Sequence, residues 1–409
     1  MAVSMDLPAT QRAIVANDEL DYSIQDDISL PPLSPDSVII RTSHVGLNPV
    51  DTKMVGPFVG AGATYGVDCA GEVVALGADI AASRRLELGD RVAGCADGME
   101  AIRPRSGAFA EYSSVHGDMV FKLPECMSFA VGAGMPLRIA TAALALFHSL
   151  GLPSELLDEQ QKKRGESFDV LVYGGATSTG TMAIQLLKIC GLRVITTCSP
   201  KNFELVRGYG ADECVDYHSP TCGPDIRAMT GNKLDYALDC VTNEGTMKIC
   251  YQALGRCGGK CRTSSFLLDE FQPVSFNAPI SNCSLATYGT DTPHPDVGLE
   301  PYPDTAATRQ AVRPDWILVT WMRGLPISWP APFGTETAKP GYQAFGREVM
   351  PKLHRLFEEA KLSSHPIREE KDGFEGLLDG VDFLRKGKVR GEKLVYRTQE
   401  RRSVVSAAA

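Results

Sequence analysis

The stretch VLVYGGATSTGTMAIQLLKICGLRVITTCSPKNF, residues 170–203, contains the pattern that decides the fold. A β-prone apolar run enters a glycine-rich turn, an amphipathic helix follows, and a second strand-like run comes next. This order predicts a βαβ unit of a parallel sheet. The letters GATSTG, from Gly175 to Gly180, match the dinucleotide fingerprint G-x-G-x-x-G except that Thr177 replaces its middle glycine.

The glycine-rich turn is suited to a pyrophosphate, which requires close backbone approach and the unpaired N–H groups of a helix N-terminus. Gly174 and Gly175 supply a tight turn, and Gly180 lets the helix pack against the strand. The alternative is that the neighbouring hydroxyls only cap the helix; caps and phosphate ligands use the same groups, so the two interpretations are compatible. The predicted phosphate ligands are Ser178, Thr179, Gly180 and Thr181.

The end of the second strand indicates which dinucleotide binds. NAD-binding units place Asp or Glu there to accept a hydrogen bond from the ribose 2′-hydroxyl. This chain has Ser199 instead, with Lys201 two residues later, and a 2′-phosphate is attracted by a hydroxyl and an amine. We therefore favour NADP(H) over NAD(H); the alternative is that Ser199 merely caps a helix whose first residue is Pro200.

Further cofactor contacts are expected near three positions. Tyr217, after a short strand, is a candidate to lie beside the adenine, and Leu254 with Gly255 is a candidate to border the nicotinamide. Core packing explains each of these residues equally well.

Composition sets the broad class. With 409 residues, 44% of them hydrophobic and 22% charged, the chain is long enough for two domains. The net charge of −9 argues against nucleic acid or an anionic membrane surface as the main partner. No signal peptide or run of transmembrane length is evident, so we expect a cytoplasmic protein. The twelve cysteines form no C-x-x-C pair, which favours free thiols over zinc sites or disulfides.

The order of patterns along the chain predicts an α/β protein with two kinds of domain. Residues 1–140 read as short strands with glycine-rich turns, typical of a partly closed barrel. Alternating strands and helices follow from residue 170 and predict a doubly wound parallel sheet. The segment 265–298 interrupts this alternation, because it is long and has no sustained period.

Six motifs in this order resemble the medium-chain dehydrogenase/reductase family over nearly the whole chain: GLNPVDTK, YGVDCAGEVVALG, LGDRVAG, GAFAEY, VYGGATSTGTMAIQLLK and GEKLVYR. A more specific resemblance is to the fungal trans-acting enoyl reductases that serve highly reducing polyketide synthases. Its motifs are NPVDTKM, TCSPKNFELVRGYGADECVDY, YALDCVTN, TRQAVRPDWIL and FLRKGKVRGEKLV.

The resemblance implies a GroES-like catalytic domain made of residues 1–140 and 360–409, and a Rossmann NADP-binding domain over 141–359. It implies that NADP(H) contacts Val50, Asp51, Thr52, Lys53, Ser178, Thr179, Gly180, Thr181, Thr197, Cys198, Ser199, Pro200, Tyr217, Leu254, Gly255, Leu394 and Val395. It further implies a substrate-lining set of Thr141, Ala142, Ala143, Leu144, Ala145, Leu146, Phe147, His148, Trp316, Ile317, Leu318, Val319 and Thr320.

Two departures from the zinc-dependent members of this superfamily predict a metal-free enzyme. Their metal-ligand cysteine is here replaced by Asn48-Pro49, and their Gly-His-Glu stretch by GVDCAGE with Asp68 and no histidine. Alcohol oxidation then lacks its Lewis acid. Hydride addition to the Cβ of an enoyl thioester does not need one, since the thioester carbonyl already polarises the double bond.

Two residues are candidates for catalysis. Lys53 lies in the loop expected near the nicotinamide and is interpreted mainly as a cofactor anchor, with a proton relay as the alternative. Thr141 is a candidate donor to the thioester carbonyl, where negative charge develops; a helix-start hydroxyl bonded to the backbone is the alternative.

Three functions remain open from the sequence. The first is NADPH-dependent enoyl reduction on a polyketide carried by the acyl carrier protein of a highly reducing polyketide synthase, and the resemblance favours it. The second is quinone or small-enone reduction, and the third is a non-catalytic NADPH-binding accessory role. The resemblance favours a monomer, with a dimer as the alternative. The segment 265–298 is either a surface loop or an artefact of the gene model.

Overall fold

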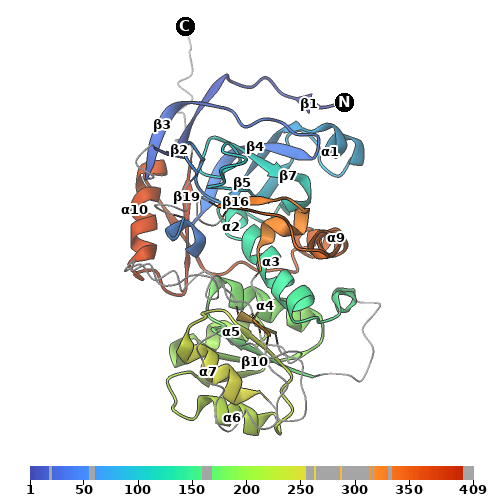
Figure 1. Cartoon of the computed structure of the whole chain (residues 1–409), viewed down its shortest axis with the longest axis vertical. Coiled ribbons are helices and arrows are strands. Elements are labelled where there is room, and N and C mark those ends of the chain that lie inside the picture. Colours follow the sequence, from blue (N-terminus) through green and yellow to red (C-terminus); the bar gives the residue numbers. More distant parts are fainter. Residues whose placement is uncertain are drawn as a thin grey trace. The chain divides into compact units, whose positions relative to one another are not determined.

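The computed structural model describes residues 1–17, 21–54, 60–158, 168–254, 262–263, 286–287, 313–314, 317–329 and 334–398. The chain forms two compact units, which are called unit 1 (residues 1–137 and 320–409) and unit 2 (residues 138–319) (Figure 1). The chain thus returns to unit 1 at residue 320, not at the expected 360. The reason is that α9 (Tyr342–Glu358) packs against β8 (Val120–Lys122) of unit 1.

Unit 1 is built on an eight-stranded sheet. Its main path runs in the order β18 (Ile367–Glu370), β19 (Lys393–Arg397), β4 (Ser37–Gly46), β5 (Asp68–Leu76), β6 (Arg91–Cys95) and β8. Two further strands, β1 (Val3–Ser4) and β7 (Tyr112–His116), pair with β5 and β4, and β2 (Thr10–Ala16) pairs with β3 (Tyr22–Ser29) in a hairpin. The C-terminal strand β19 therefore lies between β18 and β4.

Glycines permit the close strand contacts in this sheet. A Cβ at Gly71 of β5 would lie 2.0 Å from the carbonyl oxygen of Arg41, so only glycine fits there. Gly89 has a φ of +86° in the turn that leads into β6, a backbone conformation that glycine adopts without strain.

Helices cover parts of the unit 1 sheet. The helix α10 (Gly373–Arg385) packs against β19 and against the short 3-10 helix η1 (Pro49–Thr52), and α2 (Phe129–Ala133) packs against β4, β5 and β6. The remaining elements are α1 (Ala78–Ser83), η3 (Gly117–Met119), η9 (Val319–Arg323), β16 (Ile327–Trp329) and β17 (Gly334–Glu336).

Unit 2 contains the doubly wound sheet expected from residues 170–203. Its strand order is β11 (Glu213–Asp216), β10 (Arg193–Cys198), β9 (Asp169–Tyr173), β12 (Tyr236–Asp239) and β14 (Ala286–Thr287). The first four strands are parallel, and β14 is antiparallel to β12. Its helices and turns are α3 (Pro136–Ala143), which begins in unit 1, η4 (Leu144–Ser149), η5 (Ser154–Leu157), α4 (Ser178–Ile189), η7 (Pro200–Asn202), α5 (Phe203–Gly208), α6 (Cys222–Met229) and α7 (Glu244–Ala253).

Both faces of this sheet are buried, which explains its continuous apolar runs. Leu171, Tyr173 and Ile195 belong to a core cluster with residues of α6 and α7. Because side chains alternate along a strand, Val170 and Val172 point to the opposite face, and both are fully buried. The helix α4 packs against β9 and β10.

Most of the expected interruption at 265–298 lies outside the described residues. Within it the structure describes Ala286–Thr287, which form β14 at the end of the sheet. Two further short strands, β13 (Arg262–Thr263) and β15 (Arg313–Pro314), pair in parallel. Within the described ranges no helix has both the length and the apolar character needed to cross a bilayer.

Candidate active site

The glycine-rich loop of unit 2 requires its glycines. Gly174 has a φ of +78°, and its N–H donates to the carbonyl oxygen and to Oγ1 of Thr197, both at 3.1 Å. A Cβ at Gly175 would lie 1.9 Å from Oγ1 of Thr196, and a Cβ at Gly180 would lie 2.4 Å from the carbonyl oxygen of Gly174. The loop therefore packs so tightly against α4 and β10 that side chains larger than hydrogen do not fit at Gly175 and Gly180.

Thr177 replaces the middle glycine of the fingerprint without strain, because its φ is −79°. Its Oγ1 accepts a hydrogen bond from the Gly180 N–H at 3.0 Å and so caps α4. The sequence placed Thr177 among hydroxyls open to phosphate; here this hydroxyl is the helix cap.

The first turn of α4 offers a better phosphate ligand. The Ser178 hydroxyl is buried and has no hydrogen-bond partner among the described residues. A buried, unpartnered hydroxyl at the N-terminus of a twelve-residue helix fits a phosphate oxygen of a dinucleotide. Thr181 differs, because its hydroxyl donates to the Ser178 carbonyl oxygen at 3.0 Å.

The end of β10 carries polar side chains and no carboxylate at Ser199. Ser199 occupies the N-cap position of η7, with Pro200 as its first residue, but the Ser199 side chain makes no capping bond. Its hydroxyl instead bonds the Tyr217 hydroxyl at 3.2 Å, since Tyr217 follows the neighbouring parallel strand β11. The exposed Lys201 makes no ion pair with any described residue. A pair of hydroxyls thus follows the strand where an NAD-binding unit has a carboxylate, and an exposed lysine comes two residues after Ser199.

Unit 1 contains a buried polar cluster of Asn48, Asp51, Asp68 and Lys393, called the Lys393 cluster below. The Lys393 ammonium donates to Asn48 Oδ1 and Asp68 Oδ2, each at 2.7 Å, and the Asn48 amide donates to Asp68 Oδ2 at 2.9 Å. The Asn48 N–H donates to Asp51 Oδ2 at 2.7 Å, which completes a capping box around η1. This cluster fixes the loop that ends in Lys53.

Burial controls the protonation of Asp51. It raises the pKa of this carboxyl group to about 8; the Asn48 N–H opposes the shift, and the nearby Asp68 adds to it. Its Oδ1 has no hydrogen-bond partner within the described part of the chain. The Tyr65 hydroxyl donates to the Asp51 carbonyl oxygen, and the Tyr65 ring stacks on Tyr22 with 3.8 Å between centroids. The core therefore encloses Asp51 on the inner side of the loop.

The donor set of this cluster does not suit zinc. Asn48 and Asp68 occupy the two positions where the resemblance places metal ligands in zinc-dependent relatives, and here a buried ammonium bridges them. A divalent cation would meet this positive charge and one carboxylate, without thiolate or imidazole donors. Over all the described residues, no group of three or more His, Cys, Asp and Glu side chains is arranged to hold a metal.

The other predicted cofactor residues lie in three parts of the chain: in and after η1, in β19 and in unit 2. Val50, Thr52 and Lys53 are half-buried in and just after η1, whereas Asp51 points into the core. Leu394 and Val395 lie in β19, with side chains buried in the unit 1 sheet. These two strand residues can therefore contact a ligand only through their backbone groups. Thr179, Thr197, Cys198 and Leu254 belong to unit 2, and Gly255 lies outside the described residues.

The predicted substrate stretch 141–148 begins in α3 and continues as the π-helical turn η4. Six of its side chains are buried, and only Thr141 and His148 are partly exposed. A π-helical turn widens a helix locally and occurs often at functional positions. In the second stretch, Ile317 to Thr320 are half-buried, and Trp316 lies outside the described residues.

Sequence reasoning missed Lys393 and the role of Asp51. Lys393 is separated from Asn48 by 345 residues, so no local pattern links them. The sequence held one hint of such a partner. Asn48 and Asp68 stand where zinc-dependent relatives have metal ligands, and a buried carboxylate that binds no metal needs another cation beside it.

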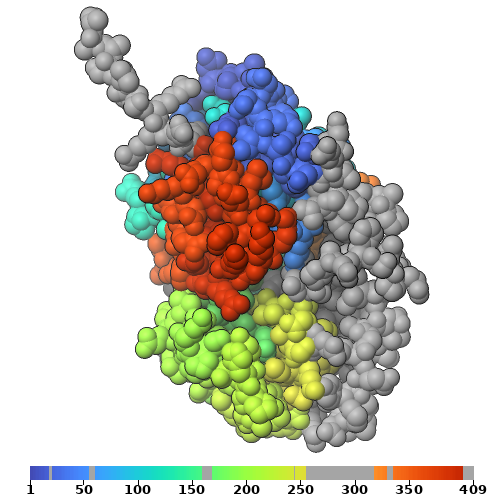
Figure 2. Space-filling view, turned by 90° about the vertical axis from the view of Figure 1, so that its left-hand side faces the viewer, coloured from blue at the N-terminus to red at the C-terminus, as the bar shows by residue number. Residues whose placement is uncertain are grey.

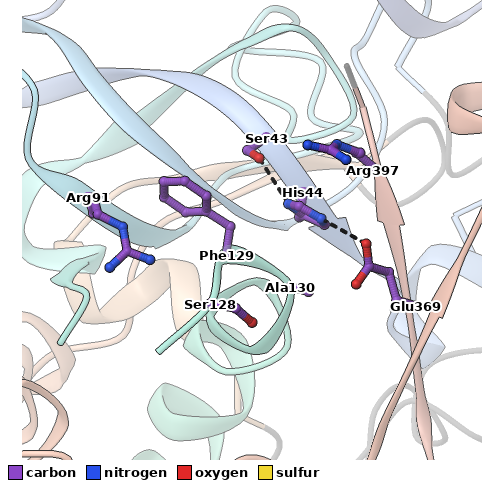
Figure 3. Close-up of a pocket in the computed structure, with 8 residues that line it drawn as sticks. All are labelled: Ser43, His44, Arg91, Ser128, Phe129, Ala130, Glu369 and Arg397. Atoms are coloured by element: carbon purple, nitrogen blue, oxygen red, sulfur yellow. Dashed lines mark hydrogen bonds and ion pairs between the residues drawn. The ribbon is translucent and has the colours of Figure 1, made fainter. Parts of the chain in front are cut away.

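A separate surface pocket of about 370 Å³ in unit 1 contains none of the predicted site residues (Figure 3). His44 lies within it, bonded to Ser43 at 2.9 Å and to Glu369 at 3.2 Å. Arg91 donates to the Met127 carbonyl oxygen at 2.6 Å, so its guanidinium supports the pocket wall. The full lining is Ser43, His44, Arg91, Ser128, Phe129, Ala130, Glu369 and Arg397.

Comparison with known proteins places these features in a family. Residues 34–125 match the alcohol dehydrogenase GroES-like domain, and residues 178–290 match the zinc-binding dehydrogenase model. The trans-enoyl reductase buaC of Petromyces alliaceus is 42% identical over 97% of this chain and 99% of its own length. The trans-enoyl reductase mpsG of Macrophomina phaseolina is also 42% identical, over 96% and 99%.

Solved structures share the fold at lower identity. The CurK enoyl reductase has a TM-score of 0.64 and 16% identity, covering 95% of this chain and 99% of its own. The quinone oxidoreductase of Coxiella burnetii has a TM-score of 0.59 and 22% identity, with the same coverage.

Proposed function

The chain belongs to the trans-enoyl reductases, an enoyl reductase branch of the medium-chain dehydrogenases, and we propose that it uses NADPH to reduce the α,β-double bond of a polyketide thioester. The thioester is carried by the acyl carrier protein of a highly reducing polyketide synthase, which the enzyme serves as a separate chain. The observation that carries the choice of cofactor is the Ser199–Tyr217 hydroxyl pair beside Lys201 at the end of β10.

Unit 2 residues hold the cofactor in this proposal. Ser178 and the N-terminus of α4 bind the pyrophosphate, because the Ser178 hydroxyl is buried and unpartnered among the described residues. Ser199, Tyr217 and Lys201 bind the 2′-phosphate. When bound, NADPH supplies the hydride that is added to Cβ of the substrate.

Residues of unit 1 and of α3 are proposed to anchor the cofactor and to donate a hydrogen bond to the substrate. The Lys393 cluster holds η1 in place, and Lys53 at its end anchors the cofactor. Thr141 donates to the thioester carbonyl oxygen, where negative charge develops before Cα takes up a proton. Loss of one such donor raises an activation barrier by about 3 kcal/mol.

The first test is the loss of nicotinamide absorbance with purified protein, NADPH or NADH, and either a 2-enoyl pantetheine thioester or a simple quinone. Thioester turnover with NADPH is expected. Quinone turnover without thioester turnover would assign the protein to small-enone chemistry instead. NADPH binding without turnover of either substrate would favour an accessory role.

The cofactor assignment has its own test. In Ser199→Asp a carboxylate faces the 2′-phosphate, so the KM for NADPH should rise about 10- to 100-fold while NADH is used no worse. Ser83→Asp, which adds the same charge on the exposed helix α1, is the matched control. An unchanged KM for NADPH in Ser199→Asp would place the 2′-phosphate elsewhere.

A further inference from the structure

A basic turn follows the C-terminus of α10 in unit 1. Residues 385–391, RKGKVRG, carry four positive charges and no negative one, although the whole chain has a net charge of −9. We call this segment the basic turn. The four charged residues are Arg385, Lys386, Lys388 and Arg390, and all are exposed.

Stabilisation of the C-terminus of α10 explains only two of these four positive charges. Arg385 and Lys386 pair with Asp382 at 2.6 and 3.9 Å and favour the negative end of the helix dipole. Lys388 and Arg390 lie beyond the helix and form no ion pair with another described residue. Two positive charges thus remain available to a partner.

The basic turn has a defined shape. The Lys388 N–H donates to the Phe383 carbonyl oxygen at 3.1 Å and the Gly387 N–H to that of Leu384 at 3.0 Å, which is a Schellman-type helix end. Lys388 lies over the exposed ring of Phe383, with its ammonium 5.1 Å from the centroid. The red C-terminal segment that contains α10 and the turn forms part of the face shown in Figure 2.

The turn is attached directly to the loop proposed to hold the cofactor. The Arg385 guanidinium donates to the Thr52 carbonyl oxygen at 3.4 Å, next to Lys53. The helix α10 packs against η1, and a Cβ at Gly380 would meet the Tyr396 hydroxyl at 2.0 Å. The basic turn therefore lies at the border of the unit 1 part of the site.

We propose that the basic turn, with Phe383, is the docking surface for the acyl carrier protein that delivers the substrate. This inference rests on the proposed function. A carrier-bound thioester reaches the enzyme on a phosphopantetheine arm, whose phosphodiester is anionic, and the arm's attachment point must stay outside the site. The basic turn carries one exposed aromatic ring and borders the loop that ends in Lys53. Its positive charge complements the anionic attachment point of the arm.

The test compares one enoyl group on two carriers. The charge reversal Lys388→Glu/Arg390→Glu is assayed with a 2-enoyl acyl carrier protein and with the same group on N-acetylcysteamine, which has no phosphate. The KM for the carrier-bound substrate should rise about tenfold or more, with kcat and the N-acetylcysteamine reaction unchanged within about twofold. Lys361→Glu/Lys371→Glu makes the same charge change at two exposed lysines away from the turn and should have no effect.

Other outcomes would overturn the inference. An equal loss with both substrates would show that the turn supports the fold, and a rise only in the KM for NADPH would assign it to the cofactor. Unchanged kinetics and unchanged binding of the unloaded carrier protein, measured by titration calorimetry, would place docking elsewhere. If the unaltered enzyme reduces neither thioester, the proposed function itself fails, which this comparison separates from failure of the docking surface.

Discussion

The buried ammonium of Lys393 stabilises the interior of unit 1. Lys393 is 5% exposed and Asp68 is completely buried, so their ion pair is removed from water. Desolvation makes such a pair expensive to form, but removal of one partner costs more, because it leaves a buried charge without compensation. The Asn48 amide and the Leu137 N–H complete the hydrogen bonds of Asp68.

Lys393→Met should therefore lower the free energy of unfolding by about 3–5 kcal/mol. Urea denaturation followed by tryptophan fluorescence measures this loss. The double variant Lys393→Met/Asp68→Asn should recover much of it, since no buried charge remains. The exposed Lys361→Met is the control; equal stability of Lys393→Met and the unaltered chain would contradict the argument.

The raised pKa of Asp51 makes stability depend on pH. An aspartate that has a pKa of about 8 in the folded state keeps its proton between about pH 4 and 8, where the unfolded chain has lost it. The folded state thus binds more protons in this window, and the Asp51 contribution to stability falls as the pH rises through it.

Asp51→Asn should remove this contribution, because a neutral amide of the same shape replaces the carboxyl group. The free energy of unfolding of the unaltered chain, relative to the variant, should fall between pH 5 and 8 by at most ~1.4 kcal/mol per pH unit. Urea denaturation at several pH values measures the difference. A difference that stays constant over this range would show that Asp51 is ionised throughout.

At the scale of elements, an ion pair joins two segments of unit 1. Arg323, at the end of η9, donates to both carboxylate oxygens of Asp97, one of them at 2.5 Å. Burial opposes ionisation of Asp97, yet the Arg323 guanidinium holds its pKa below the ordinary value. Arg103 donates to the Pro326 carbonyl oxygen at 3.1 Å and strengthens the same connection. These bonds fix the segment in which the chain returns to unit 1.

Arg323→Met should release this segment, because Asp97 would be buried without its partner. We expect thermolysin to cut within residues 317–329 about tenfold faster, together with a loss of about 3–5 kcal/mol in stability. Asp97→Asn/Arg323→Met should be cut more slowly than the single variant. Equal cleavage rates in the single variant and the unaltered chain would show that other contacts hold the segment.

Local pattern predicted the elements of unit 2 well and their polar details less well. The alternation of strands and helices predicted from residue 170 is confirmed by β9, β10 and β11 and the helices between them. The π-helical turn η4 was not predicted, because its residues Leu144–Ser149 have ordinary helix-forming composition. The alternative role considered for Ser199, a helix cap, is not seen, because its hydroxyl makes no capping bond and instead bonds Tyr217, which the pairing of β10 with β11 brings near.

At the scale of the whole molecule, the last described strand completes the first unit. The strand β19 pairs with β18 on one side and with β4 on the other, so residues near the two ends of the chain share one sheet. Leu394, Val395 and Tyr396 of β19 are all buried. The GroES-like unit therefore lacks an internal strand of its sheet until the chain is nearly complete.

A chain that ends at Glu392 should fail to form a stable unit 1, because it lacks β19 and Lys393. We expect it to accumulate as aggregate, measured by the soluble fraction after expression. A chain that ends at Thr398 keeps all the described strands and serves as the control. Soluble, thioester-reducing protein from the shorter chain would contradict the role given to β19.

The sequence by itself determined the βαβ unit, the two kinds of domain and the resemblance to enoyl reductases. These follow from short-range signals: the period of apolar residues, glycines at tight turns, and residues next to one another at a strand end. Tertiary structure alone decided that Lys393 meets Asn48 and Asp68, that Asp51 is enclosed, and that the basic turn borders η1. The contacts of Lys393 and Arg385 join residues hundreds of positions apart. Strand order and helix packing determine them, and no local period encodes either.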